Sequence, residues 1–185
     1  MNNKGFTLIE AIVALAIFIA ISATLAQIIV VSIQNQIKIT TTQNMFNQAI
    51  FSLDKIEKEL RMAKKDGDGR CVDVPGNNYA TSLNSITFLH HDQVSGLKCK
   101  KFTLEGGRIK EYMSSDENKD NFAPGIDVTG SSTTIDALNF NVIGDGPNDL
   151  QPRVTITMEI KNGKIEDQSP VMLQTTISQR RLDLQ

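Results

Sequence analysis

The chain has 185 residues, enough for one folded domain with an additional segment. Its 19 basic and 21 acidic side chains nearly balance, so the sequence lacks the basic stripe of a nucleic-acid-binding surface, and no direct nucleic-acid binding is expected. The apolar residues are unevenly spread. No residue between Glu10 and Lys38 is charged, whereas charges recur throughout the rest of the chain.

The longest apolar run covers residues 11–33. As a helix it would be about 35 Å long, enough to cross a hydrocarbon core of about 30 Å. The run is too long for a secretory signal peptide, and no small-residue cleavage site follows it. Lys4 precedes the run, so the amino end is expected to stay in the cytoplasm while the rest is translocated. The sequence therefore predicts a single-pass membrane protein.

Glu10 lies at the edge of this apolar run, with no basic residue one helical turn away. A carboxylate in that position is costly, and ionisable residues inside a membrane segment are usually functional. A simpler interpretation stays open, in which the run is an uncleaved signal anchor and Glu10 reaches the membrane interface.

The residues that lead into the apolar run read Lys4-Gly5-Phe6-Thr7-Leu8-Ile9-Glu10. This segment resembles the class III signal sequence of type IV prepilins and pseudopilins. The resemblance implies that prepilin peptidase cuts between Gly5 and Phe6 on the cytoplasmic side and N-methylates Phe6. It also implies that residues 1–5 are removed as a leader peptide and that the apolar segment is retained.

Cleavage would place a positively charged amine on Phe6, and Glu10 follows four residues later. Residues four apart lie on one face of a helix. In a filament of staggered parallel helices, Glu10 of one subunit can then meet the Phe6 amine of its neighbour. Each charge is costly alone in an apolar interior, whereas the pair is tolerated. Glu10 is therefore expected to act in assembly, with no catalytic part.

The helical pattern continues beyond the apolar run, because apolar residues recur at steps of three and four, as in an amphipathic helix. These residues are Phe46, Ala49 or Ile50, Leu53, Ile56, Leu60 and Ala63. Neither glycine nor proline occurs between Phe6 and Asp66. The sequence thus predicts one helix with a hydrophobic transmembrane and filament-core part, residues 6–37, and an amphipathic part, residues 38–65. The amphipathic part is expected to pack against strands of its own chain and not to form a dimeric coiled coil, because predicted strands follow it.

Residues 66–185 are predicted to form a β-rich extracytoplasmic domain. The predicted strands cover residues 85–90, 98–105, 108–113, 137–143, 154–161 and 171–177. Gly106-Gly107 and Asn162-Gly163 are two-residue hairpin signals, and the first would place Glu105 opposite Arg108. A helix that covers one face of an antiparallel sheet would bury these stripes, so the predicted fold class is α+β. The resemblance implies the same layout.

Cys71 and Cys99 are the only cysteines. An even, small number of cysteines in an exported chain favours one disulfide, which would tie the loop after the helix to a strand. Many major pilins instead enclose a C-terminal loop with a disulfide, so this chain departs from their commonest pattern.

Other candidate chemistry is set aside. His90-His91 closes a predicted strand, so the two rings should point to opposite faces and share no metal. The acidic loops at residues 66–69, 116–120 and 145–149 do not match the spacing of an EF-hand and are interpreted as solvated turns. No nucleophile–base set stands out. We therefore expect no metal, no cofactor and no enzymatic activity.

Three roles remain. The first is a minor pilin or minor pseudopilin that primes or caps a filament, the second is a major pilin, and the third is a membrane-anchored extracytoplasmic binding protein. The position of the cysteines and the rather large C-terminal domain favour the first. The expected partners are other pilin-like subunits, prepilin peptidase, the inner-membrane assembly platform and, before assembly, membrane lipid. The expected location is the inner membrane and then a filament that is extracellular or periplasmic. Adhesion or motility pili, competence pili and type II secretion share this kind of helix.

Overall fold

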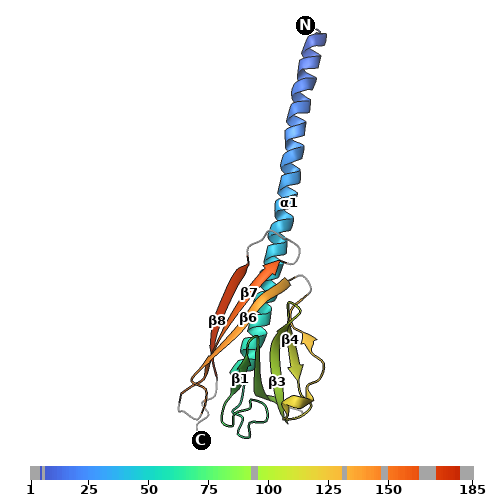
Figure 1. Ribbon diagram of the computed structural model, residues 1–185. Coiled ribbons are helices and arrows are strands. Elements are labelled where there is room, and N and C mark those ends of the chain that lie inside the picture. Colours follow the sequence, from blue (N-terminus) through green and yellow to red (C-terminus); the bar gives the residue numbers. More distant parts are fainter. Residues whose placement is uncertain are drawn as a thin grey trace. The chain divides into compact units, whose positions relative to one another are not determined.

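The structure, a computed structural model, describes residues 5, 7–92, 96–130, 133–146, 150–162 and 170–179, with only the backbone of Asn162. The chain divides into two compact units, residues 1–43 and residues 44–185. The second unit is called the head below. Figure 1 labels the helix and most of the strands.

The single long helix, α1, runs from Leu8 to Arg61. In the first unit its side chains are exposed from Leu8 to residue 40, and large apolar residues such as Phe18 and Ile28 are among them. Three consecutive threonines, residues 40–42, disfavour a helix locally, yet α1 continues through them. Within the helix, Thr41 donates its hydroxyl to the Ile37 carbonyl at 2.7 Å. By length and composition, this part of α1 could cross a membrane.

In the head, α1 is amphipathic and turns one stripe toward the core. Its buried residues are Met45, Ala49, Ser52, Leu53, Ile56 and Leu60. The predicted positions Leu53, Ile56 and Leu60 are thus confirmed. Ile50, which the pattern offered together with Ala49, is instead 50% exposed.

The helix ends at Arg61 and not at residue 65 as predicted. The backbone N–H of Lys64 donates to the Leu89 carbonyl at 2.9 Å, and that of Asp66 donates to the Asn77 carbonyl at 2.9 Å. These groups are therefore satisfied outside the helix, and the chain leaves α1 one turn early.

The described residues form eight strands, all in antiparallel pairs. They are β1 (Tyr79–Ser82), β2 (Ser85–Asp92), β3 (Gly96–Glu105), β4 (Arg108–Met113), β5 (Ile126–Asp127), β6 (Thr133–Ile143), β7 (Arg153–Asn162) and β8 (Val171–Ser178), with a short 3-10 helix at Lys119–Asn121. The α+β class is confirmed. The strands form two sheets, in the orders β1-β2-β3-β4-β5 and β6-β7-β8, whereas the sequence did not indicate this division.

The hairpin between β3 and β4 has the predicted register, with Glu105 opposite Arg108. Gly106 and Gly107 have positive φ angles of 60° and 73°. The two-residue turns that are common in β-hairpins need positive φ angles, and glycine adopts them without strain. The other predicted turn, Asn162-Gly163, extends beyond the described residues.

Both sheets and the amphipathic part of α1 share one hydrophobic core, and Figure 1 shows them gathered around the C-terminal half of the helix. Phe88 of β2 and Phe102 of β3 stack in this core with ring centroids 6.1 Å apart. The β6 strand links the sheets, because the Ile135 N–H donates to the Gly107 carbonyl at 2.9 Å.

Charged side chains also meet between α1 and the five-stranded sheet. Lys100 of β3 is 3% exposed, and its Nζ lies 2.8 Å from Glu111 of β4 and 3.0 Å from Glu59 of α1. Lys55 of α1 also pairs with Glu111. Nδ1 of His90 lies 3.3 Å from Glu59, without hydrogen-bond geometry. Two cations thus balance two anions, the condition under which buried charges are tolerated.

Because His90 lies in this charged cluster, we predict that acid lowers the stability of the head. Burial lowers the pKa of His90 below its ordinary value of 6.5, and the Lys100 cation lowers that pKa further, although Glu59 opposes both. As pH falls from about 7 to 5, the unfolded chain takes up a proton that the folded head resists, so the free energy of unfolding falls, by at most about 1.4 kcal/mol per pH unit for one proton. His90→Gln should flatten the pH dependence in this window.

Tyrosine fluorescence during urea unfolding measures this effect, because the only tyrosines, Tyr79 and Tyr112, lie in the head and the chain has no tryptophan. The matched control is His91→Gln, since His91 is exposed on the opposite face of β2. Equal slopes for His90→Gln and the unchanged chain would contradict the prediction.

Candidate functional site

The first turn of α1 begins at a helix cap. Thr7 directly precedes the helix, and its hydroxyl accepts the N–H of Glu10 at 3.4 Å, while its carbonyl accepts the N–H of Ala11 at 3.3 Å. Thr7 was not predicted as a helix cap from the sequence. The available signal was the Thr-x-x-Glu spacing of Thr7 and Glu10, which is typical of a capping box.

Glu10 therefore sits in the first turn of α1, where a carboxylate interacts favourably with the positive end of the helix dipole. Its side chain is exposed, and the next charged residue along α1 is Lys38. Gly5 is exposed before the helix, and among the described residues no atom lies within 4 Å of the place where its Cβ would stand. Phe6, the other side of the predicted cleavage site, lies outside the described residues.

A disulfide joins Cys71, in the loop after α1, to Cys99 in β3, with the two Cα atoms 5.5 Å apart. Both residues are buried, and with Val72 and Leu89 they form a second hydrophobic core separate from the main one. Phe122 packs against the edge of this second core. The disulfide therefore fastens the loop to the strand inside a small packed cluster.

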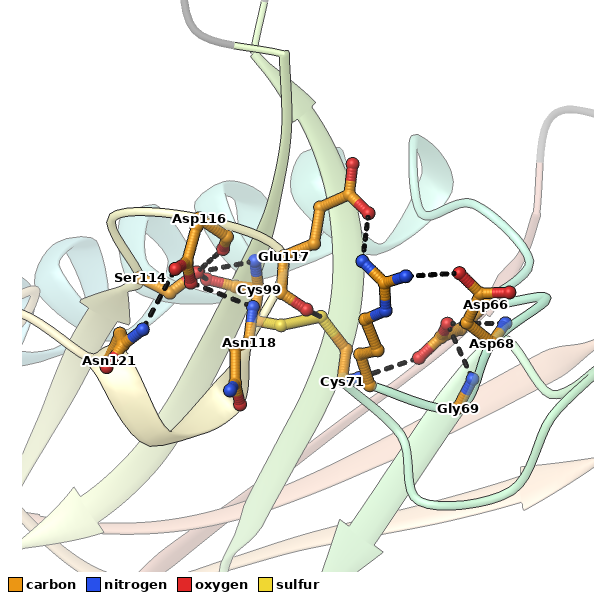
Figure 2. Close-up of polar contacts among 11 residues, drawn as sticks. Asp66, Asp68, Gly69, Cys71, Cys99, Ser114, Asp116, Glu117, Asn118 and Asn121 are labelled. Carbon is orange, nitrogen blue, oxygen red and sulfur yellow. Dashed lines mark hydrogen bonds and ion pairs between the residues drawn. A yellow bond between two sulfur atoms is a disulfide. The ribbon is translucent and has the colours of Figure 1, made fainter.

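The loop that carries Cys71 is organised by the buried carboxylate of Asp66 (Figure 2). One oxygen accepts the N–H of Gly69 at 2.9 Å, and the other accepts the N–H groups of Cys71 and Val72 at 2.7 and 3.1 Å. The N–H of Asp68 also donates to the first oxygen, at 3.3 Å, so four backbone donors satisfy a charge that would otherwise be costly to bury.

A second loop, residues 114–122, lies beside the first in Figure 2. Arg70 connects the two loops, with nitrogen atoms 3.1 Å from Asp68 and 3.5 Å from Glu117. Ser114 accepts the N–H of Cys99 at 2.8 Å, so this loop is also tied to the disulfide-bonded strand. The whole arrangement fixes the two loops against β3.

The acidic residues Asp116 and Asp145 also fix loops, by accepting hydrogen bonds. Asp116 accepts the N–H of Asn118 and the side-chain amide of Asn121, each at 2.9 Å, and Asp145 accepts the N–H of Tyr79 at 3.0 Å. Asp149 lies outside the described residues. Among the residues that the structure describes, no group of three or more His, Cys, Asp or Glu side chains could hold a metal ion.

We predict that the double replacement of Cys71 and Cys99 by alanine lowers the free energy of unfolding of the head. The cysteines lie 28 residues apart, and freeing a loop of that length in the unfolded chain corresponds to about 3–4 kcal/mol. The urea midpoint should fall accordingly, and reductant should lower it in the unchanged chain but not in the double variant. Two free thiols in the exported chain, or equal midpoints, would contradict the prediction.

Residues 1–26 match a family model described as the prokaryotic N-terminal methylation motif. The match spans the predicted leader, Glu10 and the first turns of α1. No curated protein and no solved structure matches the chain. The match is confined to the amino-terminal segment, where it supports a pilin-like signal of the kind that prepilin peptidase processes, leading into a helix that could cross a membrane by length and composition.

Proposed function

We propose that the chain is a structural subunit of a type IV pilus-like filament, cleaved by prepilin peptidase between Gly5 and Phe6 and N-methylated on Phe6. The observation that carries the proposal is the methylation motif at residues 1–26, which runs without a break into the exposed apolar part of α1. Exposed apolar surface of this extent must be covered by lipid or by other helices. Membrane insertion and later filament assembly supply these two environments in turn.

In this proposal Glu10 receives a partner only by assembly. Cleavage creates an amine on Phe6, and Glu10 is the single carboxylate between that amine and Lys38. When neighbouring helices are staggered, the amine of one subunit pairs with Glu10 of the next, so both charges are compensated inside the filament. The pair then sets the register between subunits.

The role of a minor pilin or minor pseudopilin, which primes or caps assembly, fits the chain better than that of a major pilin. Its disulfide, Cys71–Cys99, closes an early loop against β3, whereas many major pilins enclose a C-terminal loop. The partners in this role are other pilin-like subunits, prepilin peptidase and the assembly platform of the inner membrane. The amino end lies in the cytoplasm and the head outside.

The test is the mass of the mature amino terminus, measured in cells that contain prepilin peptidase. We expect a chain that begins with methylated Phe6. A bulky residue at Gly5, as in Gly5→Leu, should leave the precursor uncleaved, whereas Gly5→Ala should be cleaved in larger part. An intact Met1 on the unchanged chain would contradict the proposal and favour a membrane-anchored ectodomain.

The number of copies in sheared filaments then separates a minor from a major subunit. A few copies per filament support priming or capping. A filament built mainly of this chain would instead assign it the role of a major pilin.

A further inference from the structure

Residues 67–76 form the loop that carries Cys71, and they are called the Cys71 loop below. The base of this loop is closed by two backbone hydrogen bonds. The Asp66 N–H donates to the Asn77 carbonyl at 2.9 Å, and the Gly76 N–H donates to the Asp66 carbonyl at 2.7 Å. The loop therefore leaves the rest of the head and returns to it at one place, so its conformation can change without moving the strands.

The polar contacts that organise the Cys71 loop are local. The Asp66 carboxylate accepts N–H groups from residues 68, 69, 71 and 72, and Figure 2 shows it beside Gly69 and Cys71. Arg70 and Asp73 form ion pairs with the neighbouring loop, residues 114–122, through Glu117 and Lys119. All four of these side chains are exposed, and exposed ion pairs contribute little to stability.

The apolar contacts of the Cys71 loop are few. Its buried apolar residues are Cys71 and Val72, which belong to the small second core and not to the main core. Val74 is 51% exposed. Asp73 has a φ angle of 65°, in the left-handed region that residues other than glycine rarely adopt, so the closed loop also carries a backbone cost. The disulfide to Cys99 is therefore the strongest connection between this loop and β3.

We propose that the Cys71–Cys99 disulfide is a redox switch, and that its reduction opens the Cys71 loop while α1 and both sheets stay packed on the main core. A dithiol reductant supplies two electrons and two protons. The Sγ–Sγ bond breaks, both cysteines become thiols, and the reductant becomes a disulfide.

Two effects favour the open loop after reduction. The disulfide holds the loop near its middle, so it restricts every open form to two short segments, and its loss gives the open loop many more conformations. Opening also lets water hydrate the Asp66 carboxylate and the four N–H groups that it binds, so these hydrogen bonds are exchanged and not simply lost.

The main core does not need the Cys71 loop. Its buried residues come from α1, Ala63 and the strands. Tyr79, at the start of β1, donates its hydroxyl to the Leu60 carbonyl at 2.7 Å, and this contact holds β1 to α1 beyond the end of the loop. A chain with reduced cysteines would thus present a protease-sensitive loop on a folded head. This inference does not depend on the proposed function.

The test is hydrogen–deuterium exchange of the full-length chain in mild detergent, before and after reduction by dithiothreitol. Alkylation and mass measurement of a separate sample verify that two thiols have formed. The amide hydrogens at positions 71 and 72, which bind Asp66, should exchange at least about tenfold faster after reduction. Those of residues 154–160 in β7, the central strand of its sheet, should keep their slow exchange.

The double variant Cys71→Ala, Cys99→Ala is the matched control. It should show fast exchange at positions 71 and 72 without reductant, no further change with reductant, and slow exchange in β7, which also shows that the variant is folded. Unchanged exchange at positions 71 and 72 after full reduction would overturn the proposal. Equally accelerated exchange in β7 would also overturn it, because the head would then open as a whole.

Discussion

Glu10→Ala is expected to leave the chain processed and folded but to lower its incorporation into filaments at least about tenfold, which corresponds to about 1.4 kcal/mol or more. The physical reason is that the variant leaves the Phe6 amine of a neighbour without a partner in an apolar interior. Removing one member of a buried ion pair typically costs about 3–5 kcal/mol. The measurement is the amount of the chain in sheared filaments relative to the amount in membranes.

Two further substitutions at the same position separate charge from shape. Glu10→Gln keeps the size of the side chain but removes the charge, so it should resemble Glu10→Ala. Glu10→Asp keeps the charge on a shorter side chain and should retain more assembly than either. If Glu10→Ala is incorporated as well as the unchanged chain, Glu10 has no pairing role.

Lys100→Ala is expected to lower the free energy of unfolding of the head by about 3 kcal/mol or more. Lys100 is almost fully buried, and its ammonium group is the contact that Glu59 and Glu111 share. Without it, the ion pairs that remain here among the described residues are Glu59 with His90 and Glu111 with Lys55. Both carboxylates then remain between α1 and the sheet with too little compensation. Urea unfolding followed by tyrosine fluorescence measures the change.

Lys101→Ala is the matched control, because Lys101 is the next residue along β3 and points to the opposite face of the sheet. Its Nζ lies 5.9 Å from the centre of the Tyr112 ring, a contact of about 1 kcal/mol or less at such a site. A similar loss of stability in both variants would mean that the buried charged cluster contributes nothing specific.

The features that the sequence predicts well are local ones. The α1 stripe follows from the spacing of Leu53, Ile56 and Leu60, and the β3–β4 hairpin follows from Gly106-Gly107, because each depends on residues close together in the chain. The long strands are predicted for the same reason. β1 and β5 were missed, since four and two residues are too short to show a periodic pattern.

The candidate site also has one part that the sequence predicts and one part that it does not predict. The motif around Gly5 and Glu10 is contiguous, so the sequence alone indicates processing and assembly, although Thr7 as a helix cap was overlooked. The carboxylate of Asp66 gives the opposite case. Its role in organising the loop of Cys71 could not be predicted, because aspartate beside glycine is equally typical of a solvated turn.

By itself, the sequence determined the apolar helix with its motif, the α+β class and most strand positions, because periodicity, turn residues and short motifs act over a few residues. Only the tertiary structure decided that the strands divide into two sheets, that α1 ends at Arg61, and that Lys100 lies between Glu59 and Glu111. These outcomes depend on contacts between residues far apart in the chain, and such contacts leave no periodic trace in the sequence.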